Sequence, residues 1–192
     1  MNTLADDVAA RGRRVILRCK RLSDAKDDYA WRSDEELARY DAALPLRISF
    51  SDFLASLLAQ LRYPDPGRRS YAIEDESGRH IGNAMYYNLR EALGEAELGI
   101  TIGDRRYWGQ GYGSDAVQAL VKLVFREKGL RRMFLHTLDW NVRAQRCFQK
   151  AGFVPCGLVQ RDGRSFLLME KLQRLEQGQA PKWQVERGGD DG

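Results

Sequence analysis

The feature of this sequence that most constrains the fold is a glycine-rich loop between a predicted strand and a predicted helix. Gly109, Gly111 and Gly113 alternate directly before a helical stretch over 114–128, and the segment 96–102 before them has the alternation of a strand. The first amides of a helix lack partners within the helix, and glycines let an anion approach them closely. The order of strand, glycine loop and helix therefore predicts a phosphate-binding site rather than a flexible turn.

Two common phosphate-binding motifs do not fit this loop. The Walker A pattern ends in Gly-Lys-Ser or Gly-Lys-Thr, and that ending is absent. The residues from Gly111 to Ala116 fit the dinucleotide fingerprint, but that fingerprint needs its glycines directly at the strand end, and residues 103–108 intervene. Asp139 also lies further along the chain than the fingerprint expects. Which phosphate ligand the loop binds is left open by these motifs.

The remaining elements predict an α/β fold with a single mixed, mostly antiparallel central sheet flanked by helices. Helical spacing begins at Asp24 and again at Ser51, after a first strand over 15–17. Strands are expected over 70–74, 80–88, 96–102, 133–138, 153–160 and 164–172, with a further helix over 141–151. We expect one folded domain over 13–175, a flexible N-terminus over 1–12 and a disordered tail over 176–192.

Composition excludes several classes of protein. The 192 residues are 43% hydrophobic, which suits one globular domain, and no run has the length of a membrane span. Cys19, Cys147 and Cys156 are odd in number and widely spread, which argues against a disulfide framework and a metal site and for a cytoplasmic location. The net charge of +4 is scattered, so no specific nucleic-acid partner and no membrane partner is expected.

Two blocks of residues carry a family resemblance. The run from Glu97 to Ala116 resembles the acetyl-CoA-binding segment of the GNAT superfamily of N-acetyltransferases, whose signature is Arg/Gln-x-x-Gly-x-Gly/Ala. The block from Asn141 to Phe153 is similar to that family's later helix and strand, and it follows at the expected separation. The amino-acid sequence of the loop looks most like that of the branch with the ribosomal-protein alanine acetyltransferases and spermidine acetyltransferases. The resemblance covers about residues 15–172.

The resemblance implies acetyl-CoA as co-substrate, no metal, and a GNAT-like acyltransferase fold. It implies cofactor contacts from the strand, the loop and the later helix: Ile100, Thr101, Ile102, Trp108, Gly109, Gln110, Gly111, Tyr112, Gly113, Ser114, Asn141, Ala144, Phe148 and Lys150. Two positions depart from the pattern. Trp108 replaces the signature Arg or Gln, so backbone amides would carry the pyrophosphate, aided by Arg105 or Arg106. Phe148 replaces the tyrosine that protonates the leaving thiolate in many members.

The activity that the resemblance implies is transfer of an acetyl group to a primary amine by direct attack on the thioester. An alkylamine has a pKa near 10.4, so a base has to remove its proton. Glu97 is the candidate because it matches the strand glutamate of related enzymes, and Glu95 could add negative potential. The alternative for Glu97 is a solvated carboxylate at a strand edge. His136, which alternates within an apolar strand, is predicted to be a core histidine.

The acceptor is left open by the sequence. A protein N-terminus, a polyamine or another small amine all fit as the acceptor. The sequence is also compatible with a homodimer. A non-catalytic, regulatory acyl-CoA-binding domain is the alternative function, since the tyrosine is missing. Tyr107 and Tyr112 in the loop are the alternative proton donors.

Overall fold

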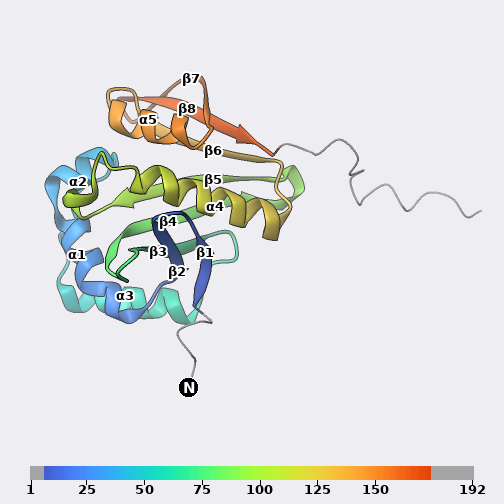
Figure 1. Ribbon diagram of the computed structural model, residues 1–192. Coiled ribbons are helices and arrows are strands. Elements are labelled where there is room, and N and C mark those ends of the chain that lie inside the picture. The colour runs from blue at the N-terminus through green and yellow to red at the C-terminus, as the bar shows by residue number, and fades with distance from the viewer. Residues whose placement is uncertain (1–6, 174–192) are drawn as a thin grey trace, which may run out of the picture.

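The computed structural model describes residues 7–173, and it forms an eight-stranded sheet with five α-helices (Figure 1). The expected 1–6 portion of the N-terminus and the 176–192 tail lie outside the described residues. In chain order the elements are β1 (Val8–Arg11), β2 (Val15–Cys19), α1 (Ala25–Ser33), α2 (Glu35–Tyr40), α3 (Phe50–Arg62), β3 (Arg69–Asp75), β4 (His80–Arg90), β5 (Glu95–Ile102), α4 (Tyr112–Lys128), β6 (Arg132–Leu138), α5 (Val142–Lys150), β7 (Val154–Arg161) and β8 (Arg164–Leu172).

The sheet has the strand order β1-β2-β3-β4-β5-β6-β8-β7. Its neighbouring strands are antiparallel, except for β5 and β6, which are parallel because α4 crosses over between them. The expectation of a mixed, mostly antiparallel sheet is confirmed.

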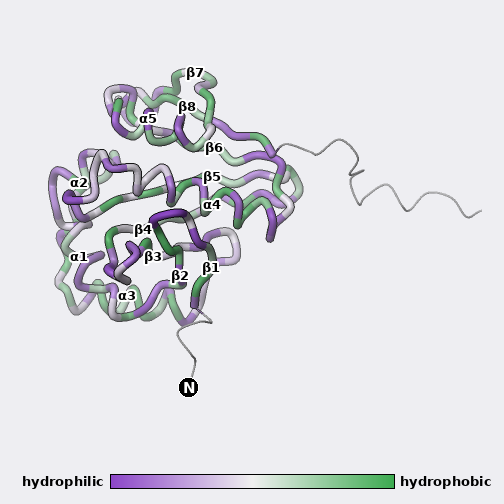
Figure 2. Tube along the Cα trace, viewed as in Figure 1, coloured by the Kyte–Doolittle hydropathy of each residue, from purple (hydrophilic) through white to green (hydrophobic). Residues whose placement is uncertain are grey.

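The main core lies between α4 and one face of the sheet. Leu120 and Val124 on α4 are buried together with Leu17 from β2 and Leu98 from β5. Gly129 ends α4 in a left-handed conformation, as its place in the sequence predicts. Figure 2 shows hydrophobic stretches along the central strands and α4, whereas α1 and α2 are mostly hydrophilic.

The opposite face of the sheet is covered by the first helices. Successive strand residues point to opposite faces, so Leu98 points toward α4 while Glu97 and Thr101 point away from it. Asn83 on β4 pairs with Thr101 and donates a hydrogen bond to Asp28 of α1 at 2.7 Å. The second face therefore carries the residues that lie between the sheet and the α1–α3 layer, and we call it the acceptor face.

Strands β5 and β6 separate part-way along their length. Their parallel pairing runs from Glu95 with Arg132 to Glu97 with Phe134 and ends there, although the strands continue to Ile102 and Leu138. The backbone groups on that edge of β5 beyond Glu97 are left for another partner. Separation of two parallel strands at their C-terminal ends places an opening in the sheet beside the start of α4.

The structure differs from the sequence-based expectation at the N-terminal side. Residues 8–11 form β1 and pair with β2, because the exposed edge of β2 supplies the hydrogen-bond partners that a short segment lacks alone. Three helices, not two, precede β3, since Asp34 has an extended backbone and caps a new helix, α2. Helix α3 begins after Ser49 instead of Ser51, and Ser49 accepts a hydrogen bond from the Asp52 amide.

Candidate active site

The start of α4 is an anion-binding arrangement made of backbone. Gly109 and Gly111 have φ of +74° and +91°, in the left-handed region that favours glycine, and a Cβ at either would meet no protein atom within 4 Å. Gly111 is the N-cap, and no side chain caps the helix there. The first amides of α4 therefore face open space, where the dipole of the helix favours negative charge.

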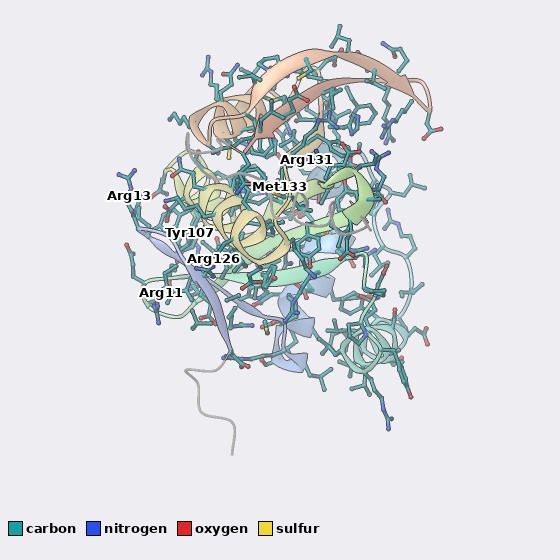
Figure 3. All side chains as sticks on the ribbon, turned by 90° about the vertical axis from the view of Figure 1, so that its right-hand side faces the viewer. Arg11, Arg13, Tyr107, Arg126, Arg131 and Met133 are labelled. Carbon is teal, nitrogen blue, oxygen red and sulfur yellow. The ribbon has the colours of Figure 1, made fainter. Side chains whose placement is uncertain are left out.

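The loop is held in place by the distant β1–β2 hairpin. Arg14 donates to the Gln110 carbonyl at 2.6 Å and to the Tyr112 hydroxyl at 2.9 Å, and its guanidinium lies 4.1 Å from the centre of the Tyr112 ring. Asp115, in the first turn of α4, accepts hydrogen bonds from the Arg13, Arg14 and Val15 amides. Figure 3 shows Arg11 and Arg13 projecting outward from this hairpin.

Trp108 lies where the family signature has Arg or Gln, and its side chain spans the opening. Its indole nitrogen donates to the Ile102 carbonyl at 2.6 Å, and the Arg143 guanidinium of α5 lies 3.4 Å from the centre of a Trp108 ring. Arg105 and Arg106, which were expected to aid pyrophosphate binding, form ion pairs with protein carboxylates. Arg105 pairs with Asp34 and Glu36, and Arg106 pairs with Asp104.

Helix α5 borders the same region. The Asn141 side chain accepts a hydrogen bond from the Ala144 amide at 3.2 Å, which confirms its role as N-cap. Phe148 is buried, with its ring 6.1 Å from that of Phe153 in an edge-to-face contact, and Lys150 is exposed. The expected cofactor residues thus come from three elements that meet here: the end of β5, the start of α4, and α5.

These features fit acetyl-CoA. The first amides of α4 beside open glycines suit a pyrophosphate, and the edge of β5 over 99–101, which no longer pairs with β6, suits the amide groups of a pantetheine arm. No group of three or more His, Cys, Asp or Glu side chains among residues 7–173 is arranged to hold a metal ion.

Glu97 lies on the acceptor face at the point where β5 and β6 separate. Its side chain is 8% exposed, so it is not a solvated strand-edge carboxylate. Oε1 is 2.7 Å from His136 Nδ1, and Oε2 accepts a hydrogen bond from Asn88 Nδ2 at 3.0 Å. Burial and the neighbouring Glu97 raise the pKa of Tyr87, which pairs with Glu97 across the β4–β5 ladder. The carboxylate is therefore fixed in direction by two side-chain nitrogens.

Glu95 has a different environment from Glu97. It forms ion pairs with Arg90 at 2.5 Å and with Arg132 at 2.7 Å. Two arginines compensate its charge, so the added negative potential expected from Glu95 is largely neutralised.

The two tyrosines considered as proton donors have partners on the side of β1–β3. The Tyr107 hydroxyl donates to Asp75 at 2.6 Å, and the Tyr112 hydroxyl accepts from Arg14. The hydrogen bond to Asp75 raises the pKa of Tyr107.

A second carboxylate lies further along the acceptor face. Asp41, which follows α2, accepts a hydrogen bond from the Thr101 hydroxyl at 2.8 Å. The Asp41 residue belongs to an exposed turn, but surrounding protein groups desolvate its carboxylate and raise its pKa to about 6, against the effect of the Thr101 hydrogen bond. Thr101 is four residues beyond Glu97 on the same face, which corresponds to about 13 Å along a strand.

Three residues of the site, His136, Asn88 and Asp41, were not predicted from the sequence. For His136 a signal was present: a strand, helix and strand in series predict parallel neighbours, and Glu97 and His136 both sit in that pair. Asn88 enters through an irregularity in the β4–β5 pairing, with φ of +50°, and Asp41 enters from a helix end distant in sequence. Neither has a local pattern that predicts it.

Comparison with known proteins identifies the family. The sequence profile of the acetyltransferase (GNAT) domain matches residues 14–154. The chain belongs to the GNAT acetyltransferase family. The family resemblance seen in the sequence is thereby confirmed, and the enzyme transfers the acetyl group of acetyl-CoA to an amine.

Two similar proteins align with most of the length of this GNAT enzyme. It is 34% identical over 180 residues to an aminoglycoside N(6')-acetyltransferase type 1 of Klebsiella pneumoniae, covering 84% of this chain and 85% of that protein. It is 26% identical over 147 residues to an uncharacterised N-acetyltransferase, p20, of Bacillus licheniformis, covering 76% and 82%.

Solved structures share the fold of this GNAT enzyme. Spermidine N-acetyltransferase from Vibrio cholerae, in complex with coenzyme A and spermine, has a TM-score of 0.74 at 21% identity, covering 83% of this chain and 96% of that one. An aminoglycoside acetyltransferase in complex with coenzyme A has a TM-score of 0.67 at 24% identity, covering 83% and 95%.

Among residues 7–173, none of the helices combines the length and the apolar character that a membrane-spanning helix needs.

Proposed function

We propose that this acetyltransferase acts on small polycationic amines and uses Glu97 as its general base. The observation that carries the proposal is the pair of carboxylates on the acceptor face, Glu97 beside the opening in the sheet and Asp41 fixed by Thr101. Two anionic groups spaced along one strand face match an acceptor with two or more ammonium groups. One ammonium lies at Glu97 and loses its proton, and another pairs with Asp41.

The partners of the two strand glutamates support this assignment. Glu95 is paired with two arginines, but the hydrogen-bond donors that hold Glu97 are an imidazole, an amide and the Tyr87 hydroxyl. An Asn amide is neutral, so it orients Glu97 without compensating its charge. A buried carboxylate without a cationic side chain paired to it attracts an ammonium and then accepts its proton within a low-dielectric site.

The reaction needs little more from the protein. Acetyl-CoA supplies the acetyl group as an activated thioester. Glu97 removes a proton from the bound ammonium, the neutral amine attacks the carbonyl carbon, and the thiolate leaves. A thiol with a pKa of about 8.5 is a tolerable leaving group near neutral pH, so the absence of a tyrosine at Phe148 does not prevent turnover. Backbone amides of β5 beyond Glu97 are the candidates for stabilising the carbonyl oxygen.

The similar proteins support the same class of acceptor. The names of the relatives specify spermidine in one case and aminoglycosides in another. Both are small molecules with several amino groups. A protein N-terminus, by contrast, carries a single α-amino group.

The test compares acceptors that differ only in the number of amino groups. Steady-state kinetics with butylamine, 1,4-diaminobutane, spermidine and kanamycin, read as free thiol released, should give the lowest KM values for the polycations. Asp41→Asn should raise the KM for spermidine about tenfold and leave that for butylamine unchanged. Since the pKa of Asp41 is raised to about 6, its charge is lost as pH falls from 7 to 5, and the KM for spermidine should rise over that range in wild type only.

Two outcomes would contradict the proposal. A peptide N-terminus acetylated with a higher kcat/KM than every polycation would assign the enzyme to protein substrates. Equal KM values for butylamine and spermidine in wild type and in Asp41→Asn would remove Asp41 from acceptor binding.

A further inference from the structure

His136 connects the candidate base to an arginine on the other side of the sheet opening. The His136 side chain is 9% exposed on β6, and its ring contacts Phe134 edge-to-face at 5.9 Å. Nδ1 lies 2.7 Å from Glu97 Oε1, and Nε2 lies 3.1 Å from an Nη2 of Arg161. Arg161 is the last residue of β7, so its side chain reaches past β8 to β6. Both ring nitrogens are therefore occupied.

The two partners determine which nitrogen carries the proton. A guanidinium has only donors, so Nε2 can make its contact with Arg161 only as an acceptor. The single proton of a neutral imidazole is then on Nδ1, where it is donated to the Glu97 carboxylate. With Nε2 accepting from Arg161, the ring takes the tautomer that carries its proton on Nδ1.

This arrangement excludes His136 as an acceptor for the proton that Glu97 removes. The nitrogen that faces Glu97 already carries a proton, and the other nitrogen faces a guanidinium. The proton from the amine therefore remains on the Glu97 carboxylate until the site exchanges with solvent. The Nδ1–H group holds Oε1 in one direction through its hydrogen bond to the carboxylate.

We infer that His136 is a positioning residue for Glu97, locked by Arg161 in the tautomer with the proton on Nδ1. The inference rests on the proposed role of Glu97 as base. It differs from the expectation of a core histidine, because a residue that only fills space would affect the enzyme equally whether or not Glu97 is present. Arg161 acts on Glu97 indirectly, because it fixes the His136 ring.

The kinetic test is a double-mutant cycle between residues 136 and 97. His136→Leu keeps similar volume and removes the donor, and we expect it to lower kcat about 10- to 100-fold, as loss of a residue that orients a functional group does. In the Glu97→Gln background the same substitution should change kcat by less than about threefold. His136→Asn, which places an amide N–H near the position of Nδ1, should restore most of the wild-type kcat. The affinity for acetyl-CoA, measured by calorimetry, should stay within about twofold in each variant and serves as the folding control.

The outcomes separate this inference from the proposed function. An equal loss from His136→Leu in both backgrounds, or no rescue by His136→Asn, would overturn the positioning role while leaving Glu97 as base. If Glu97→Gln alone retained full kcat, the proposed base would be wrong, and the positioning role would fail with it.

A spectroscopic measurement tests the tautomer without any turnover. The chain has two histidines, so ¹⁵N NMR of labelled protein with and without His136→Leu assigns the His136 ring. We expect a protonated Nδ1 and an unprotonated Nε2 at pH 7, and Arg161→Leu should allow the other tautomer or the doubly protonated ring. A ring with its proton on Nε2 in wild type would contradict the inference, and His80→Gln assigns the two rings if His136→Leu does not fold.

Discussion

The two ends of the active site are built from different parts of the chain. The cofactor end is made of consecutive backbone groups at the start of α4, with Gly109 and Gly111 in left-handed conformations and no side chain as cap. The catalytic end is made of side chains from four strands: Glu97 on β5, His136 on β6, Asn88 on β4 and Arg161 on β7.

The difference teaches which kind of site a local sequence pattern can reveal. A site made of amides depends on backbone conformation, and a run of glycines before a helix specifies that conformation within a few residues. A site made of side chains depends on strand order and register, which bring residues up to 39 positions apart into contact. Substitutions at the two ends should therefore separate cofactor affinity from chemical rate.

The largest effect is expected at the catalytic end. Glu97→Gln keeps the shape of the side chain but removes the proposed base, so kcat should fall about 10²- to 10⁴-fold at pH 7. The loss should shrink toward pH 10, where the amine deprotonates without help. Calorimetry should show unchanged acetyl-CoA affinity. Wild-type kcat in this variant would return Glu97 to a structural role, and a large loss of acetyl-CoA affinity would mean that the two ends are not separable.

A smaller effect, on acetyl-CoA affinity and not on kcat, is expected at the cofactor end. Gly111→Val places a β-branched residue at φ of +91° and a side chain in the space that faces the α4 amides, so acetyl-CoA affinity should fall at least about tenfold. Gly129→Val is the matched control: it lies at the other end of α4, also with positive φ and open space around it. Both variants should lose roughly 1–2 kcal/mol of stability in denaturant unfolding. Equal acetyl-CoA affinities in the two variants would remove the loop from phosphate binding.

The smallest effect concerns the hairpin that holds the loop. Arg14→Gln removes the hydrogen bonds to Gln110 and Tyr112, and we expect acetyl-CoA affinity to fall about three- to fivefold with kcat unchanged. Arg13→Gln changes a neighbouring exposed arginine on the same hairpin and should leave affinity unaltered. If both variants lost the same affinity, general positive charge on the hairpin, not the Arg14 contacts, would be responsible.

Much of the fold follows from the sequence pattern. The strands from β3 onward, helix α4 with its buried face, and the Gly129 and Asn141 helix ends are as the sequence predicts, since periodicity and capping are local properties. The extra strand β1, the break between α1 and α2, and the start of α3 differ, because an unpaired strand edge and short capped turns decide them. Boundaries of this kind depend on partners that a window of sequence does not contain.

By itself the sequence determined the family, and it predicted the glycine loop as the cofactor site and Glu97 as the base, because glycine conformation, helix capping and a strand carboxylate can be read from consecutive residues. Only the tertiary structure decided which groups act on that base. It paired Glu95 with arginines but left Glu97 to His136 and Asn88, and it set Asp41 against Thr101 on the same face. The physical reason is that a carboxylate's charge and direction are set by groups within hydrogen-bond distance, and those groups come from other strands and helices.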